Sequence, residues 1–149
     1  QSEILMPSLI KLLEEAHLNV EDLSKIAVVV GPGSFTGVRL GVTIAKTMAY
    51  CKKIPIVTLT SLEILLPVKT DYVAISEKNG YFLGLVAQGQ IKEYQYLSKE
   101  AFLEFTKSHQ VTENESLKIE QLMKIISCKE PINPHLVNPF YVKKIEVEK

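Results

Sequence analysis

Apolar residues in the first quarter of the chain recur at the spacing of an amphipathic helix. From Ser2 to Leu18 they fall three and four positions apart, which predicts a helix with Ser2 as its N-cap and with Ile4, Leu5, Leu9, Leu12, Leu13 and Ala16 on its apolar side. The next apolar run, residues 25–30, is continuous and is typical of a buried parallel strand. A glycine-rich stretch follows, and the pattern then predicts a helix at 34–50, a strand at 54–60 and a short helix at 60–67.

Alternating apolar and polar residues characterise the stretch 71–98. Asn79-Gly80 favours a type I′ hairpin turn, and Gly89-Gln90 indicates a second turn, so we expect a three-stranded antiparallel meander. A helix capped by Ser98 is predicted as far as His109, then a charged helix at 115–127 and an extended tail with several prolines. The chain is expected to form two α/β lobes, residues 1–68 and 69–149.

Composition narrows the classes of function. The 149 residues contain 17 basic and 17 acidic side chains, and a net charge of zero argues against a free-standing nucleic-acid-binding protein while leaving a role within a complex open. Cys51 and Cys128 form no CxxC motif, which favours two reduced thiols in a cytoplasmic protein. No apolar run approaches twenty residues, so no membrane-spanning segment is expected.

The stretch GPGSFTG, which begins at Gly31, follows a predicted strand and precedes a predicted helix. This arrangement directs backbone N–H groups toward an anion, yet the stretch fits neither the GxxxxGK[ST] pattern nor GxGxxG. A generic phosphate loop remains an alternative, formed by Gly31, Gly33, Ser34, Thr36 and Arg39. In the other interpretation, Arg39 makes a surface ion pair.

Small residues recur every four positions in the helix after this loop, at Gly37, Gly41, Ala45 and Ala49. A glycine inside a helix costs about 1 kcal/mol relative to alanine, so a compensating contact is expected. A stripe of small side chains lets a second helix approach closely. That second helix is either the leucine-rich first helix of this chain or a helix of another chain.

Candidate catalytic groups are scarce. His17, His109 and His135 are scattered, and each is expected to be a surface or packing residue rather than a ligand. No nucleophile motif, metal-ligand spacing or convincing carboxylate pair is present, so we expect no catalytic residues and no metal site.

The segments SEILMPSLIKLL and EDLSKIAVVVGPGSFTGVRLGVTIAKTMAY resemble the bacterial TsaB (YeaZ) family, whose members carry DLxxIxVxxGPGSFTGxRxGxxxAK. The resemblance covers about residues 1–65. It implies a two-lobed actin/Hsp70/sugar-kinase-like (ASKHA) fold, whose opening strands are expected to be missing from this chain. It also implies a role in making N6-threonylcarbamoyladenosine, a modified nucleoside beside the anticodon of tRNA.

In that family, TsaB is the non-catalytic relative of the transferase TsaD. The resemblance implies a scaffold that pairs with a TsaD-type transferase, is joined by a TsaE-type ATPase and meets tRNA only through the complex. The implied pairing surface consists of Leu5, Leu9, Leu12, Gly37, Gly41, Ala45 and Ala49. No cofactor is expected other than ATP or ADP at the partner interface, and a homodimer through the same surface is the variant of this hypothesis.

Two departures from the family pattern concern other contacts. Gln1 stands where a histidine usually precedes Ser-Glu, and Ser76–Lys78 replaces a DAR-type segment at the start of the second lobe. They weaken any expectation of nucleotide or tRNA contact through that lobe. The alternative function is a small ATP-binding or ATP-hydrolysing enzyme that uses the loop Gly31–Thr36.

Overall fold

The computed structural model describes residues 2–113 and 118–142, and the chain divides into two compact units. The first unit comprises Gln1–Leu59 and Cys128–Pro139, and the second comprises Thr60–Ser127 and Phe140–Lys149. A single division after residue 68 therefore does not describe the structure. The segment after Leu59 already belongs to the second unit, where the Thr60 hydroxyl lies 3.1 Å from that of Tyr94.

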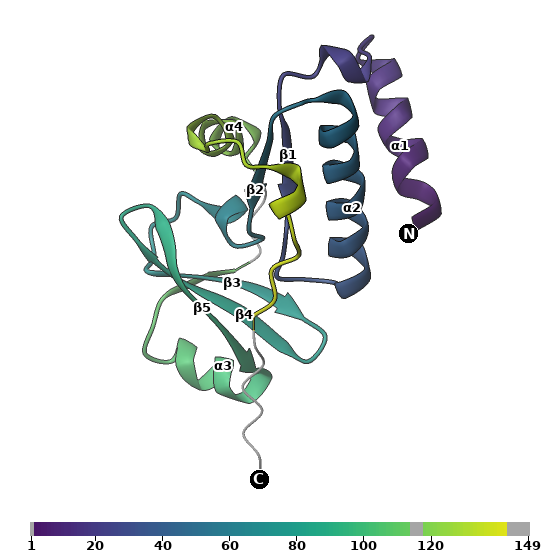
Figure 1. Cartoon of the computed structure of the whole chain (residues 1–149). Helices are drawn as coiled ribbons and strands as arrows, with labels where there is room; N and C mark the ends of the chain where they lie inside the picture. Colours follow the sequence, from purple (N-terminus) through teal and green to yellow (C-terminus); the bar gives the residue numbers. More distant parts are fainter. Residues whose placement is uncertain (1, 114–117, 143–149) are drawn as a thin grey trace. The chain divides into compact units, whose positions relative to one another are not determined.

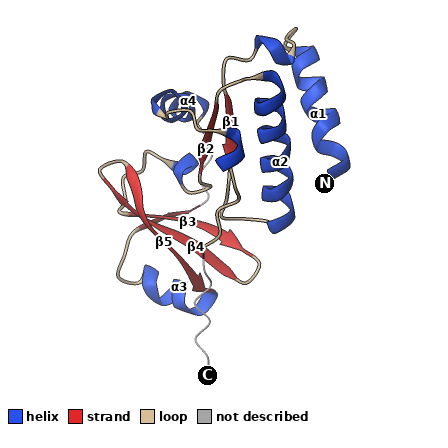
Figure 2. Cartoon of the chain, viewed as in Figure 1, coloured by secondary structure: helices blue, strands red, loops and turns tan. Residues whose placement is uncertain are grey.

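The first unit contains two helices beside a short parallel sheet (Figures 1 and 2). Its elements are α1 (Ser2–Glu15), η1 (Val20–Asp22), β1 (Ile26–Val29), α2 (Phe35–Lys52), β2 (Ile56–Leu59) and η3 (Pro134–Leu136). Strands β1 and β2 are parallel, with Ile26 opposite Ile56. The structure confirms the predicted helices before and after the first strand, α1 and α2. It also confirms the two predicted strands, β1 and β2.

Helix α2 has well-defined ends. The Ser34 side chain accepts a hydrogen bond of 3.4 Å from the Gly37 N–H, which caps the first turn. Lys53 ends the helix in the left-handed conformation, with φ of 56°. Between these ends α2 packs against β1 and buries Val42, Ala45 and Ala49.

The tail returns to the first unit rather than continuing the second. Ile132 forms an antiparallel bridge to Ile56, with an N–H···O distance of 2.9 Å. Val137 is 1% exposed, and its carbonyl accepts a hydrogen bond from Lys46. These contacts explain why residues 128–139 do not belong to the second lobe in which the sequence placed them.

The second unit is built on a four-stranded sheet with the order β5-β4-β3-β6. Strands β3 (Tyr72–Glu77), β4 (Gly80–Ala87) and β5 (Gln90–Ser98) form the predicted antiparallel meander. The sequence did not predict β6 (Val111–Glu113), which pairs parallel to β3. Helix α3 (Lys99–Thr106) begins after the Ser98 cap, as predicted.

The first hairpin turn differs from the predicted geometry, and the second lies one residue earlier than predicted, at Gln88-Gly89 rather than Gly89-Gln90. Lys78 and Asn79 connect β3 to β4, and neither has a positive φ, so Asn79-Gly80 does not form the predicted type I′ turn. The second turn does have positive φ at both central residues, Gln88 and Gly89. Gly80 is instead required by packing, because a Cβ there would lie 2.1 Å from the Leu97 carbonyl oxygen.

The predicted short helix at 60–67 is only a 3-10 turn, η2 (Glu63–Leu65). Thr60 and Glu63 exchange hydrogen bonds: the Thr60 N–H donates to the Glu63 carboxylate at 2.6 Å, and the Glu63 N–H donates to the Thr60 hydroxyl at 3.1 Å. These two reciprocal hydrogen bonds cap and stabilise the single turn of η2. Helix α4 (Ile119–Cys128) corresponds to the helix predicted at 115–127, of which residues 115–117 lie outside the described residues.

Candidate functional site

The apolar side of α1 is largely uncovered. Leu5 is 39% exposed and Leu12 is 61% exposed, whereas Leu9 between them is half-buried. Helix α1 lies beside α2 (Figure 1), yet much of its apolar surface still faces outward. The exposed apolar residues of the helix also include Ile4, Met6 and Ile10. Contiguous exposed apolar surface of this kind is typical of a surface that binds another molecule.

The small-residue stripe of α2 divides into an accessible half and a buried half. A Cβ added at Gly41 would meet no atom within 4 Å, and one added at Gly37 would meet only the Ser34 side chain, at 3.5 Å. Ala45 and Ala49, by contrast, are 8% and 1% exposed and belong to the core of the first unit. The stripe therefore offers open space at Gly41 and none at its far end.

Helix geometry explains this division. With 3.6 residues per turn, positions four apart rotate by about 40° around the axis at each step. Three such steps carry the stripe well around the helix, from the outer side at Gly37 to the strand side at Ala49. The structure thus brings Gly37 and Gly41 to an accessible side, and it does not bring Ala45 and Ala49 there.

The loop before α2 is half enclosed. Gly31 and Pro32 are buried, and Gly31 has φ of 113°, which a residue with a side chain rarely adopts. Ser34 and Thr36 are exposed, but the Ser34 oxygen already accepts the Gly37 N–H. The Arg39 guanidinium lies 3.7 Å from the centroid of the Phe35 ring, a cation–π contact.

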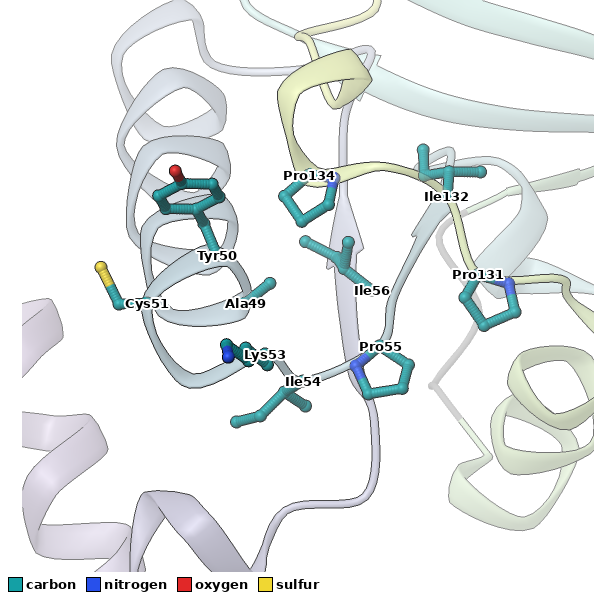
Figure 3. Close-up of a pocket in the computed structure, with 10 residues that line it drawn as sticks. All are labelled: Ala49, Tyr50, Cys51, Lys53, Ile54, Pro55, Ile56, Pro131, Ile132 and Pro134. Carbon is teal, nitrogen blue, oxygen red and sulfur yellow. The ribbon is translucent and has the colours of Figure 1, made fainter.

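A hollow of about 620 Å³ opens near the C-terminal end of α2 (Figure 3). Tyr50 flanks it and contacts the His135 ring edge-on, with 4.8 Å between ring centroids. The lining is mainly apolar, which suits contact with apolar groups rather than catalysis. The residues that line the hollow are Ala49, Tyr50, Cys51, Lys53, Ile54, Pro55, Ile56, Pro131, Ile132 and Pro134. This hollow was not predicted, because its walls lie far apart along the chain, at residues 49–56 and 131–134, and the prolines of the tail were the only sequence signal.

His109 and His135 contact aromatic rings, whereas His17 is exposed. His109 stacks on Phe105 with 4.1 Å between centroids, and its Nδ1 lies 3.0 Å from the Ser108 hydroxyl. Within the described residues, no group of three or more His, Cys, Asp or Glu side chains could hold a metal ion.

The resolved pKa shifts lie outside the loop and the stripe. Glu21 and Lys52 form an exposed ion pair, and the hydrogen bond from Lys52 lowers the pKa of Glu21. Burial raises the pKa of Tyr94, although its hydrogen bond with Thr60 opposes the shift. The pKa of Glu100 is lowered by backbone and Ser98 hydrogen bonds at the start of α3. These shifts have structural causes in ion pairing, burial and capping.

No helix in the described part of the chain is both long enough and apolar enough to cross a membrane.

Comparison with known proteins gives consistent results. A family model described as TsaD, tRNA N6-adenosine threonylcarbamoyltransferase, matches residues 1–144. The tRNA threonylcarbamoyladenosine biosynthesis protein TsaB of Bacillus subtilis (strain 168) is 53% identical over 60 residues, which are 40% of this chain and 26% of that protein. The protein of the same name from Buchnera aphidicola subsp. Schizaphis graminum is 38% identical over 61 residues, 41% of this chain and 29% of that protein. The matched stretch therefore spans less than a third of these relatives.

Solved structures extend the similarity to nearly the whole chain. A Pseudomonas aeruginosa protein described as having similarity to peptidase YEAZ superposes with a TM-score of 0.71 at 18% identity, covering 95% of this chain and 83% of that one. YeaZ from the same organism gives a TM-score of 0.69 at 19% identity, over 95% and 84%. At such identities the similarity establishes a shared mixed α/β fold.

Proposed function

This chain belongs to the family described as tRNA N6-adenosine threonylcarbamoyltransferase (TsaD), among its TsaB/YeaZ members, and we propose that it is a non-catalytic scaffold in the biosynthesis of threonylcarbamoyladenosine in tRNA. In this proposal it pairs with a TsaD-type transferase, which carries out the chemistry. A TsaE-type ATPase and tRNA join through the assembled complex. The fold it would share with that partner is the two-lobed ASKHA fold.

The exposed apolar side of α1 is the observation that carries the proposal. Leu12 is 61% exposed on a helix that stands at the surface of its unit. Burying a leucine side chain stabilises an interface by about 1.5–3 kcal/mol. A row of such residues therefore supports pairing with another apolar helix.

We define the pairing face as Leu5, Leu9 and Leu12 of α1 with Gly37 and Gly41 of α2. Ala45 and Ala49 are left out, because their burial in this chain's own core removes them from contact with a partner. The open space at Gly41 supports close approach of a second helix.

Gly41→Leu tests the pairing face. The added side chain meets nothing within 4 Å at its Cβ, so the variant should fold, yet it would fill the space that a partner helix needs. We expect the complex with a TsaD-type transferase to be lost in size-exclusion chromatography with light scattering. Thr47→Leu is the matched control, since it adds the same side chain at an exposed position elsewhere on α2. A complex that survives Gly41→Leu would show that pairing does not use this face.

The same measurement on the chain alone distinguishes a homodimer from a heterodimer. A dimeric mass that becomes monomeric in Gly41→Leu would indicate that two copies pair through this face. A monomeric mass that doubles only when the transferase is added would support the heterodimer.

The second candidate is an ATP-binding or ATP-hydrolysing enzyme that uses Gly31–Thr36. Its support is the position of this loop at the start of α2, where backbone N–H groups favour an anion. Against it, the Ser34 oxygen and the Gly37 N–H already bond to each other. Calorimetry with ATP and magnesium is the test, and the absence of binding heat would eliminate this candidate.

A further inference from the structure

A small polar hollow lies in the second unit, between the start of β3 and the segment that follows α3. It measures about 270 Å³ and is lined by residues 69–72 and 108–110, all of which belong to this unit. Pockets that take drug-sized ligands measure about 300–1,000 Å³, so a ligand of this hollow is a smaller molecule. Its described lining shares no residue with the pairing face or with the Gly31–Thr36 loop.

Two opposite charges line this hollow, Lys69 and Asp71. Both side chains are exposed, and among the described residues they form no ion pair with each other or with a third residue. A molecule that carries an ammonium group and a carboxylate of its own can pair with both side chains. A molecule with a single charge leaves one of them without a counter-charge. The lining therefore favours a ligand that carries both charges.

The ring of His109, which also lines the hollow, is held in a fixed orientation. It stacks on Phe105 with 4.1 Å between centroids and meets Tyr72 edge-on at 5.2 Å. Its Nδ1 lies 3.1 Å from the Phe105 carbonyl oxygen and 3.0 Å from the Ser108 hydroxyl. Because a carbonyl oxygen can only accept, Nδ1 carries the proton, and the neutral ring keeps Nε2 as its acceptor. His109 thus adds a positioned acceptor to the hollow.

The polar groups of the hollow supply partners for both ends of such a ligand. The Asp71 carboxylate and the His109 Nε2 accept hydrogen bonds, which suits an ammonium group with its three N–H donors. The Lys69 ammonium donates, and the Gln110 amide has two N–H groups, which suits a carboxylate. Hydrogen bonds in which one partner is charged are stronger than those between neutral groups.

We propose that this hollow binds a free amino acid, with its ammonium group at Asp71 and His109 and its carboxylate at Lys69 and Gln110. A free amino acid carries the two charges on neighbouring carbon atoms and is small enough for the hollow. The end of a peptide, by contrast, carries only one of these charges at its terminal residue. The site does not depend on pairing through α1, so the loss of amino-acid binding and the loss of a transferase complex are separate outcomes.

The test compares three related molecules as ligands of the 149-residue chain, by amide chemical shifts in NMR and by calorimetry. L-Serine carries both charges, ethanolamine lacks the carboxylate, and 3-hydroxypropionate lacks the ammonium group. We expect saturable shifts at Lys69, Asp71 and Gln110 with L-serine. Each analogue should bind about 5- to 10-fold more weakly, because it forms one charged contact fewer. An unsaturable response to L-serine, or an analogue that binds as tightly as L-serine, would overturn the proposal.

Three variants test the two ends of the site separately. Asp71→Asn should weaken binding of L-serine and ethanolamine by about 5- to 10-fold and leave 3-hydroxypropionate unchanged. Lys69→Gln should weaken L-serine and 3-hydroxypropionate and leave ethanolamine unchanged. His109→Phe keeps a ring that can stack on Phe105 but removes the Nε2 acceptor, so it should weaken L-serine and ethanolamine.

Lys107→Gln and Glu104→Gln are the matched controls. These residues form an exposed ion pair in the same unit and do not line the hollow, so both variants should bind L-serine as the parent does. Equal weakening by Lys69→Gln and Lys107→Gln, or by Asp71→Asn and Glu104→Gln, would show that the response depends only on overall charge and would overturn the proposal. So would L-serine binding that Asp71→Asn and Lys69→Gln both leave unchanged.

Discussion

The Lys46 ammonium donates a hydrogen bond of 3.0 Å to the carbonyl of Val137, ninety-one positions later in the chain. Both residues are at least partly buried, and Val137 is 1% exposed. The bond joins the middle of α2 to the tail at the point where the tail returns to the first unit. A single side chain thus helps to hold a segment that is distant in the sequence.

Lys46→Met should destabilise the first unit by about 1–3 kcal/mol, because it leaves the Val137 carbonyl without its donor in a partly buried position. The change preserves most of the apolar stem of the side chain, so the loss reports mainly on the hydrogen bond. Chemical denaturation measures the effect, and limited proteolysis should cut the tail sooner. Lys11→Met, at an exposed site, should change stability by less than about 0.5 kcal/mol. Equal stability of the two variants would show that the bond contributes nothing.

Gly84→Ala should destabilise the second unit. A Cβ there would lie 3.0 Å from Ile91 Cγ2 and 3.1 Å from Leu62 Cδ1, closer than ordinary van der Waals contact. Overpacking of this kind typically costs about 1–3 kcal/mol. Thermal unfolding measures the loss, and Leu62→Val in the same chain should recover part of it by removing one of the crowding groups. A Gly84→Ala variant as stable as the parent would mean that the sheet adjusts without cost.

Gly41→Ala should have the opposite effect. No atom lies within 4 Å of the added Cβ, and alanine is favoured over glycine in a helix interior by about 1 kcal/mol. We therefore expect a gain of up to that amount in the free energy of unfolding. A loss of stability in the isolated chain would show that the site is less open than the structure indicates.

Local patterns predicted much of this fold. The helical spacing of α1, the small residues and cap of α2, and the alternation in β3 to β5 are all properties of adjacent residues. Strand β6 was not predicted, because Val111–Glu113 is short and is defined as a strand only by its pairing with β3. The return of the tail was missed for the same reason, since Ile132 and Ile56 meet across a long stretch of chain.

The candidate site was predicted less completely. The amphipathic pattern places Leu5 and Leu12 on one side of α1, but it does not predict that this side is exposed. The burial of Ala45 and Ala49 likewise depends on which side of α2 meets the strands. Helix geometry alone predicts that residues four positions apart do not stay on one side of a helix, because each step shifts them by about 40° around its axis. The hollow between α2 and residues 137–139 could not be predicted, since Asn138 meets α2 only through tertiary contacts.

Tyr94 gives a prediction about pH. Burial raises its pKa; the hydrogen bond with Thr60 opposes this shift, and the nearby Glu63 charge adds to it. The folded state therefore holds the phenolic proton more tightly than the unfolded state, in which the pKa of tyrosine is about 10. The stabilisation is fully present below about pH 10 and is lost as the pH rises through the folded pKa.

Tyr94→Phe separates this contribution from the hydrogen bond. At neutral pH the variant should lose about 1 kcal/mol, since it removes the 3.1 Å contact between the Tyr94 and Thr60 hydroxyls. Above pH 10 its stability should fall less steeply than that of the parent, because the proton linkage of Tyr94 is gone. Urea unfolding at a series of pH values measures both effects. Tyr50→Phe, at a side chain 61% exposed, controls for loss of a phenol elsewhere. Parallel pH profiles for Tyr94→Phe and the parent would show that the proton of Tyr94 does not contribute to alkaline unfolding.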